Sequence, residues 1–212
     1  MDTPPSAQEG AGPLLHYQSR KGNFKMKQYP AKNIINIALA GHSGSGKTSI
    51  AEAMLYLSGA TDRRGKVSEG NTVCDSDPEE IRRKASVSAA VAPLEWHNHK
   101  INLLDAPGLF DFEGGLCESV RAADSVLIAV SGKDGVAVGT EKAYEAASAR
   151  GLSKIFFVNG LADEDARFYR VFEDLKSRFG PSTCPVVYRR LVACWPALLS
   201  ICRQILSSGN NN

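Results

Sequence analysis

The chain has 212 residues with a formal net charge of +2, and 43% of them are hydrophobic and 23% charged. This length suits one α/β domain with a sizeable core and is too short for two domains of ordinary size. The composition is that of a globular protein, and the small net charge gives no reason to expect DNA or a membrane surface as the main partner. The five cysteines are scattered and lack Cys-x-x-Cys spacing, and no N-terminal stretch has the pattern of a signal peptide. We therefore expect reduced thiols and a cytoplasmic location.

The first 30 residues differ in composition from the rest of the chain. Residues 1–30 are rich in Pro, Gly, Gln, Ser and Lys and have no sustained hydrophobic period, which predicts a disordered leader. Residues 33–40 (NIINIALA) then form a near-continuous apolar run that is typical of a strand buried on both faces. Residues 48–59 place Ile50, Ala51, Met54, Leu55 and Leu57 at helical spacing, with Gly59 positioned to end a helix.

A polar segment at residues 60–84 separates these elements from the next apolar runs. It has no hydrophobic period and is either disordered or a functional loop, and its acidic part, 75–80 (DSDPEE), is predicted to be solvated. Residues 85–96 and 99–108 indicate two strands joined by a tight turn at His97–Asn98. That turn explains why two histidines lie so close together, and no third metal ligand is evident beside them.

The second half of the chain alternates between apolar strands and amphipathic helices. Residues 125–132 and 154–160 are apolar runs, and residues 140–150 and 164–180 show helical periodicity. In the last helix, Phe168, Val171, Phe172 and Leu175 form the apolar stripe, and Gly180 follows it. Strands that alternate with helices predict an α/β fold, a mostly parallel sheet with helices on both faces.

The segment between the first strand and the first helix carries the strongest chemical signal. Residues 41–48 (GHSGSGKT) fit the phosphate-binding pattern G-x-x-x-x-G-K-[ST] without a mismatch. Such a loop turns successive N–H groups inward around phosphate oxygens, and the following helix directs its positive end to the same place. A Gly/Ser-rich turn that matches by chance is the plainer alternative. The predicted phosphate-binding residues are Gly41, His42, Ser43, Gly44, Ser45, Gly46, Lys47 and Thr48.

A second chemical signal follows the strand at residues 99–105. Asp105 comes at the end of this apolar strand and Gly108 three residues later. In a phosphate-loop protein, a carboxylate at this place serves a metal ion, and the glycine N–H can meet the terminal phosphate. Asp-x-x-Gly alone is a weak pattern, since any exit from a strand can contain it.

Residues 31–187 resemble the GTP-binding domain of elongation factor G, and most of all its elongation factor G-like relatives. The matching stretches, in family order and spacing, are 32–67, 70–90, 99–112, 121–143 and 156–160. The resemblance implies a P-loop GTPase that uses GTP or GDP with Mg²⁺ and acts with the ribosome. It implies that residues 60–84 are the first switch segment, and that Mg²⁺ lies near Thr48, Ser86 and Asp105. It gives catalytic roles to Lys47, Asp105 and Gly108, and it places Asn159 at the base.

Two positions depart from the family pattern. The best-known translational GTPases have a histidine after Asp-x-Pro-Gly that positions the attacking water, and here Leu109 stands in its place. The base-reading motif Asn-Lys-x-Asp becomes Asn159-Gly160-Leu161-Ala162, followed by Asp163. Losing the carboxylate that pairs with guanine weakens purine selectivity, unless Asp163 substitutes for it.

Residues 188–212 resemble nothing in the family, and we interpret them as a tail produced by truncation or a frameshift, which leaves the domain incomplete at its C-terminal end. The leading hypothesis is a GTP-binding translation factor domain that hydrolyses GTP in a ribosome-coupled cycle, with activity weakened by the two departures. The alternative is an idle nucleotide-binding module with weakened guanine specificity. A third possibility, an ATP-using P-loop enzyme, does not predict the elongation factor-like stretches.

Overall fold

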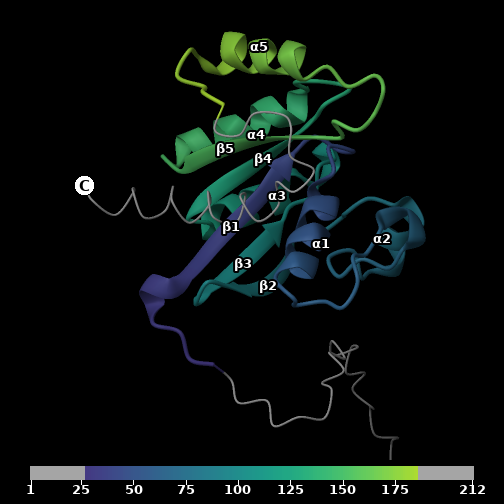
Figure 1. Cartoon of the computed structure of the whole chain (residues 1–212), viewed down its shortest axis with the longest axis vertical. Coiled ribbons are helices and arrows are strands. Elements are labelled where there is room, and N and C mark those ends of the chain that lie inside the picture. The colour runs from purple at the N-terminus through teal and green to yellow at the C-terminus, as the bar shows by residue number, and fades with distance from the viewer. Residues whose placement is uncertain (1–26, 186–212) are drawn as a thin grey trace, which may run out of the picture.

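The structure is a computed structural model that describes residues 27–185 (Figure 1). The predicted tail, and all but the last four residues of the predicted leader, lie outside this range. The strands are β1 (Ile34–Gly41), β2 (Ala90–Trp96), β3 (His99–Asp105), β4 (Ser125–Ser131) and β5 (Ser153–Asn159). The α-helices are α1 (Lys47–Leu57), α2 (Pro78–Arg83), α3 (Glu113–Ala122), α4 (Val138–Ala149) and α5 (Phe168–Phe179). Three 3₁₀ turns are η1 (Ala31–Asn33), η2 (Val67–Glu69) and η3 (Phe110–Phe112).

The described strands form one five-stranded sheet in the order β2-β3-β1-β4-β5. Strand β1 lies at its centre and pairs in parallel with both β3 and β4, and β4 pairs in parallel with β5. Only the hairpin β2–β3 is antiparallel, and its two-residue turn at His97 and Asn98 has positive φ at both residues. Positive φ at both positions is the geometry that tight hairpins favour. The predicted mostly parallel sheet and the predicted turn are confirmed.

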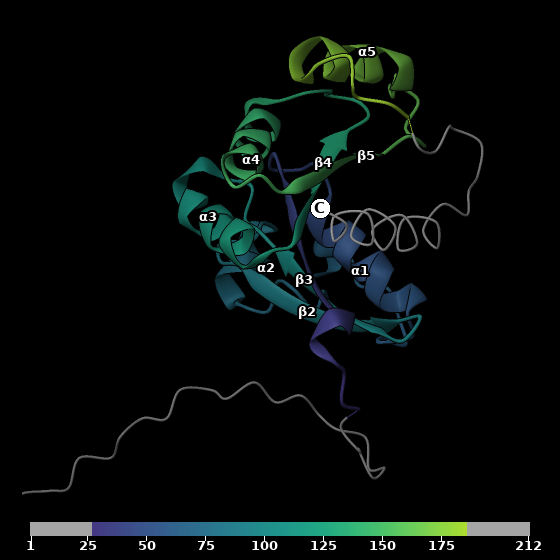
Figure 2. The same ribbon diagram turned by 90° about the vertical axis from the view of Figure 1, so that its left-hand side faces the viewer.

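Helices cover both faces of the sheet, as predicted. On β1, Ile35, Ile37 and Leu39 pack with the buried face of α1, whereas Ala38 and Ala40 pack with α3 and α4. Figure 2 shows the sheet between α1 on one side and α3 and α4 on the other. Because successive residues of a strand point to opposite faces, a strand covered on both faces must be apolar throughout. This requirement explains the continuous apolar run in the sequence.

The last helix packs at the β5 edge of the sheet. Val171 and Leu175 of α5 are buried against Val130 and Val136, as the predicted stripe requires. The side chains of β5 are less covered than those of β1, since all but the first are only half-buried. Strand β5 is therefore an edge of the sheet within the described residues.

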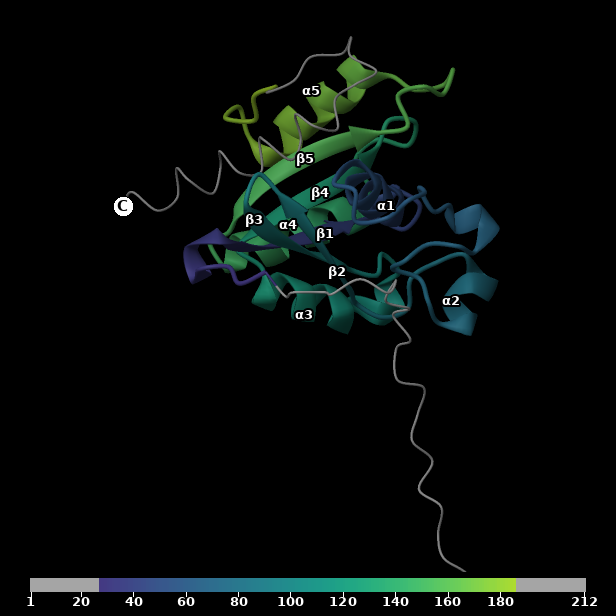
Figure 3. The ribbon, with the colours of Figure 1, turned by 60° about the horizontal axis from the view of Figure 1, so that its bottom comes forward.

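The segment 60–84 is more ordered than the sequence suggests. It contains η2 and α2, and α2 begins at a capping box in which the Asp77 side chain accepts from the Glu79 N–H. Figure 3 shows α2 beyond the end of the sheet toward which the arrow of β5 points. The prediction of a solvated acidic face is wrong for Asp75 and Glu80, whose side chains are only 4% and 3% exposed. Both carboxyl groups accept hydrogen bonds from residues 86–88, just after this segment, while the second oxygen of Asp75 is buried without a partner.

Other boundaries also differ from expectation. Strand β2 begins at Ala90 rather than at residue 85, because residues 85–89 form an irregular approach to the sheet. Helix α3 was not predicted from periodicity, and its first turn contains Gly114 and Gly115, which weaken the helical signal. Among residues 27–185, no helix is both long and apolar enough to cross a membrane.

Candidate functional site

The phosphate loop joins the carboxyl end of β1 to the first turn of α1. Gly41, Gly44 and Gly46 all have positive φ, which allows the chain to turn sharply between the two elements. Gly46 is the N-cap of α1 and its carbonyl accepts from the Ile50 N–H at 2.9 Å. A Cβ atom at Gly46 would collide with the side-chain amide of Asn159. Only glycine fits this position. Because Gly46 is also the N-cap of α1, the backbone N–H groups of the loop lie at the positive end of the helix.

Lys47 is folded over its own loop. Its Nζ donates to the carbonyl oxygens of Gly41 at 3.2 Å and of His42 at 3.0 Å, and the residue is 6% exposed. Burial lowers the pKa of Lys47, although the nearby carboxyl groups of Asp105 and Asp75 oppose this change. An anionic ligand would strongly stabilise the charged form of a lysine buried in this way, because burying an unpaired charge is costly.

The three predicted metal ligands meet at one point. Thr48 Oγ1 donates to Asp105 Oδ2 at 2.7 Å and lies 3.3 Å from Ser86 Oγ. Asp105 is 1% exposed, and its second oxygen, Oδ1, has no hydrogen-bond partner. Burial is the main cause that raises the pKa of Asp105 to about 7. The structure thus brings Thr48, Ser86 and Asp105 together from three distant parts of the chain.

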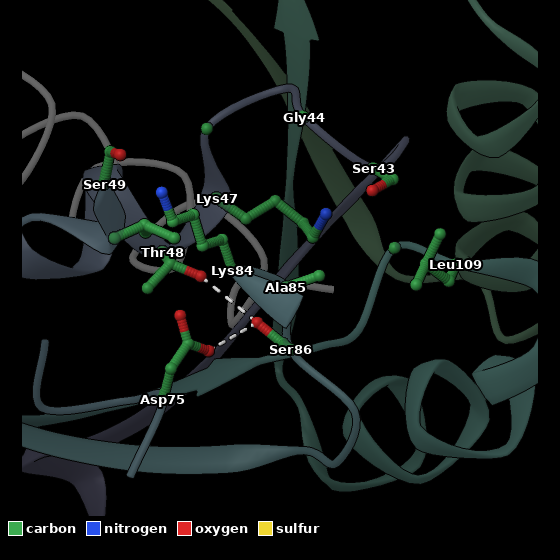
Figure 4. Close-up of a pocket in the computed structure, with 13 residues that line it drawn as sticks. Ser43, Gly44, Lys47, Thr48, Ser49, Asp75, Lys84, Ala85, Ser86 and Leu109 are labelled. Atoms are coloured by element: carbon green, nitrogen blue, oxygen red, sulfur yellow. Dashed lines mark hydrogen bonds between the residues drawn. The ribbon is translucent and has the colours of Figure 1, made fainter. Parts of the chain in front are cut away.

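Asp75 belongs to the same cluster and was missed by the sequence reasoning. Ser86 Oγ donates to Asp75 Oδ1 at 2.7 Å, and Figure 4 shows Asp75, Ser86 and Thr48 linked in this way. Asp75 Oδ2 is buried without a partner, and burial raises the pKa of this carboxyl group. The available signal was Cys74 directly before Asp75, since this cysteine is buried as well, whereas Val73 before it is exposed.

A pocket opens in front of this cluster. Gly108 and Leu109 close one side of it, and the first switch segment closes another (Figure 4). A Cβ atom at Gly108 would collide with Lys47 Nζ and would lie 2.8 Å from the Ser43 nitrogen, so only glycine fits against the loop. The lining residues are Ser43, Gly44, Gly46, Lys47, Thr48, Ser49, Val67, Asp75, Lys84, Ala85, Ser86, Gly108 and Leu109.

Three predicted phosphate-binding residues, Gly41, His42 and Ser45, do not line this pocket. The His42 ring lies 5.9 Å from the ring of Phe110, and Ser45 Oγ donates to the His42 carbonyl at 2.8 Å. The His42 and Ser45 side chains therefore contact the loop and its surroundings outside the pocket.

Asn159 connects the end of β5 to the phosphate loop. Its Nδ2 donates to the Ser45 carbonyl at 3.2 Å. Gly160 follows with positive φ, and the Asp163 N–H closes a turn onto the Gly160 carbonyl at 3.2 Å. Ala162 and Asp163 are both exposed on this turn. The structure therefore brings Asn159 against the phosphate loop, with the Asp163 carboxyl group on the exposed turn that follows it.

A parallel sheet with a glycine-rich loop between β1 and α1, a buried lysine and a carboxylate at the end of β3 defines a P-loop nucleotide-binding domain. Residues 32–208 match the family model described as the elongation factor Tu GTP binding domain, a range that extends into the residues expected to form a tail unlike the family. The chain belongs to this family, and it carries a GTP-binding domain of the translation-factor type.

Relatives within the family are large proteins. The mitochondrial ribosome-releasing factor 2 of Scheffersomyces stipitis is 37% identical over 168 residues, which are 77% of this chain and 20% of that protein. The elongation factor G-like protein of Mycobacterium tuberculosis H37Rv is 36% identical over 151 residues, which are 71% of this chain and 21% of that protein. The chain therefore spans about a fifth of the length of these curated relatives.

Solved structures agree with this assignment. A crystal structure of a Thermus thermophilus protein matches with a TM-score of 0.68 and 43% identity, over 74% of this chain and 24% of that one. A bacterial selenocysteine-specific elongation factor matches with a TM-score of 0.62 at 19% identity, over 84% of this chain and 29% of that one, and so shares the fold.

Proposed function

We propose that this domain binds GTP with Mg²⁺ and hydrolyses it in a cycle coupled to the ribosome. The observation that carries the proposal is the cluster of Thr48, Asp105, Asp75 and Ser86 directly behind the phosphate loop. Two hydroxyl and two carboxyl groups converge there, beside a buried lysine and the positive end of α1. Such a set of groups suits a phosphate chain together with a hard divalent cation.

The phosphate chain is held by the loop and by Lys47. The loop N–H groups and the N-terminus of α1 supply fixed partial charges, and Lys47 supplies a full one. Lys47 Nζ now donates to two carbonyl oxygens and can transfer those hydrogen bonds to the β- and γ-phosphates. Lys84, which also lines the pocket, adds a second positive side chain.

The oxygen atoms at the cluster fit Mg²⁺. Asp105 Oδ1 and Asp75 Oδ2 are buried atoms without hydrogen-bond partners, and both belong to carboxyl groups whose pKa is raised by burial. A cation offsets the cost of burying these groups. Thr48 and Ser86 would hold it directly, and Asp105 and Asp75 directly or through water. When bound, Mg²⁺ neutralises charge on the phosphate oxygens.

Release of the terminal phosphate would loosen the two segments that meet it. Gly108 lies against Lys47 and Ser43, where its N–H can meet a γ-phosphate. The first switch segment reaches the same pocket through Asp75, and Ser86, two residues after the segment ends, donates to this carboxyl group. Loss of the γ-phosphate would remove one contact from each, which is the order-to-disorder transition that GTPases use as a signal.

Hydrolysis has to proceed without the family histidine. Leu109 lines the pocket and can neither orient a water molecule nor exchange a proton. We infer weak intrinsic hydrolysis that depends on a group supplied by the ribosome, since the curated relatives are named as ribosome-releasing and elongation factors. The same observation favours the second candidate, a module that binds nucleotide and does not turn it over.

Single-turnover hydrolysis of γ-labelled GTP, with and without ribosomes, tests the proposal. Faster phosphate release with ribosomes supports the coupled cycle, whereas binding without turnover under both conditions supports the idle module. If the protein retains no GTP even with abundant Mg²⁺, and Lys47→Ala behaves identically, the proposal fails. A cytoplasmic location stays a prediction, because the named relatives include mitochondrial factors.

A further inference from the structure

Glu52 is a buried acidic residue that none of the roles above uses. It lies in α1 one helical turn after Thr48, and positions i and i+4 share a helix face. Its side chain is 1% exposed. Thr48 and Glu52 therefore project from the same face of α1. The Thr48 hydroxyl contacts Asp105 and Ser86, and the Glu52 carboxyl group contacts a neighbouring loop.

That neighbouring loop is the first switch segment. Glu52 Oε2 accepts from the Gly65 N–H at 3.1 Å, and Oε1 accepts from the Val73 N–H at 2.5 Å. The fit is close, because a Cβ atom at Gly65 would lie 2.5 Å from Glu52 Oε2 and 2.9 Å from the Asn71 carbonyl oxygen. One side chain thus closes the loop between residues 65 and 73 onto the helix that follows the phosphate loop.

Each of the two anchored amides lies two residues before a residue that lines the nucleotide pocket. Val67 comes two residues after Gly65, and Asp75 comes two residues after Val73, and both line the pocket. Asp75 then reaches Thr48 through Ser86, by contacts of 2.7 Å and 3.3 Å. A closed path therefore runs from Thr48 along α1 to Glu52, across to Val73, and back through Asp75 and Ser86.

We propose that Glu52 is a positioning residue that sets the first switch segment, and Asp75 in particular, for Mg²⁺. This inference rests on the proposed function, because it concerns the same metal site. Glu52 is not among the residues that line the pocket, and it acts by fixing the backbone two residues before Val67 and two residues before Asp75. Outer groups that orient metal ligands in this way contribute strongly to metal affinity.

Glu52→Gln is the sharpest test, since it preserves shape and leaves one acceptor oxygen for two N–H donors. Glu145→Gln, an exposed residue of α4, is the matched control. In the nucleotide-free protein we expect amide hydrogen exchange to accelerate about tenfold at Gly65 and Val73 in Glu52→Gln, with β1 and β4 unchanged. With GTP, the Mg²⁺ concentration for half-maximal retention should rise about tenfold, while retention at saturating Mg²⁺ stays as in the parent protein.

Gly65→Ala tests the same contact from the loop side and should give the same two changes. Unchanged exchange at Gly65 and Val73 would overturn the proposal. So would faster exchange throughout the sheet with an unchanged Mg²⁺ requirement, because that result describes a stability role only. The exchange measurement uses no nucleotide. If the parent protein fails to bind GTP, the proposed function is rejected. The role of Glu52 in holding Gly65 and Val73 is still tested by the exchange rates.

Discussion

Thr48 Oγ1 donates a hydrogen bond of 2.7 Å to Asp105 Oδ2, and this bond joins the first turn of α1 to the end of β3. The two residues are 57 positions apart in the chain. Parallel pairing of β1 with β3 brings their carboxyl ends to the same edge of the sheet, with Leu39 opposite Asp105. The hydroxyl that would bind the cation is therefore already held beside the carboxyl group that would balance its charge.

Lys47→Ala should reduce GTP affinity at least about 100-fold, which corresponds to about 3 kcal/mol. The substitution removes the buried ammonium group that faces the pocket, and alanine cannot replace its hydrogen bonds. Equilibrium binding of a fluorescent GTP analogue measures the change. Lys32→Ala, at an exposed lysine of η1, is the control and should bind as the parent protein does. Equal affinity in the two variants would contradict the assignment of the phosphate loop.

The stability of the metal-free protein should fall as pH rises from about 4 to about 7. Asp105 has a pKa of about 7 in the folded protein, above its ordinary value of 3.8, so the folded state favours the protonated carboxyl group. The stabilisation is complete below about pH 4 and is lost as Asp105 ionises, by up to about 4 kcal/mol. Asp75, whose pKa is also raised, acts in the same direction. Urea denaturation in EDTA across this range measures the effect.

Asp105→Asn provides the control for that measurement. The amide keeps the size of the side chain and cannot ionise, so the fall in stability between pH 4 and 7 should shrink. Mg²⁺ with GTP should also shrink it in the parent protein, because a bound cation stabilises the ionised form. An identical pH dependence in the parent protein and in Asp105→Asn would show that another group titrates.

Asp75→Asn should weaken Mg²⁺-dependent GTP retention by about tenfold or more. The substitution retains an acceptor for the Ser86 hydroxyl and removes the charge of a buried carboxyl group that has one free oxygen. Filter binding over a range of Mg²⁺ concentrations gives the midpoint. Asp111→Asn, at an exposed carboxyl group of η3, should leave the midpoint where it is. A normal midpoint for Asp75→Asn would remove this residue from the metal site.

Ala162→Asp should increase the preference for GTP over ATP by at least about tenfold, because a carboxylate that pairs with the guanine edge discriminates strongly between purines. Competition of labelled GTP by unlabelled ATP and GTP measures the ratio. Asp163→Ala shows whether the neighbouring carboxylate already reads the base in the parent protein. If Asp163→Ala lowers the GTP preference and Ala162→Asp leaves it unchanged, the turn at residues 160–163 has moved the base-reading carboxylate by one position.

Leu109→His should raise ribosome-stimulated GTP hydrolysis by about tenfold or more, since a well-placed imidazole orients and activates water. The site lies on the pocket wall beside Gly108, so the new ring would face the space next to the γ-phosphate. Single-turnover rates with ribosomes provide the measurement, and Leu109→Asn controls for polarity. Equal rates in both variants would mean that the ribosome already supplies the group that positions water.

The sequence was most informative where one local rule decided the structure. The apolar run of β1 and the spacing of Ile50, Ala51, Met54 and Leu55 predicted the centre of the sheet and the buried face of α1, whereas Leu57, the last residue of that pattern, is exposed at the end of the helix. The turn at His97–Asn98 followed from its place between two apolar runs. The residues Thr48, Ser86 and Asp105 came from a motif and a family resemblance, and the structure places Ser86 and Asp105 within hydrogen-bonding distance of the Thr48 hydroxyl.

What the sequence left hidden depended on contacts between distant residues. Asp75 and Glu80 look like members of an exposed acidic run, and they are buried because hydroxyl and backbone N–H groups of residues 86–88 donate hydrogen bonds to them. Glu52 resembles an ordinary polar position in a helix until Gly65 and Val73 are seen against it. Carboxyl groups of this kind accept hydrogen bonds from the backbone N–H groups of loops. A hydrophobic period in the sequence carries no information about such contacts.

The position of Lys47 Nζ has a kinetic consequence. By donating to the carbonyl oxygens of Gly41 and His42, the ammonium group holds the loop in a curved conformation that suits an anion. An arriving polyphosphate then has to swing aside one flexible side chain, and no backbone must fold around it. Capture should accordingly proceed near the rate of encounter, and the lifetime of the complex, governed by the cation and the first switch segment, should set how long the domain stays loaded.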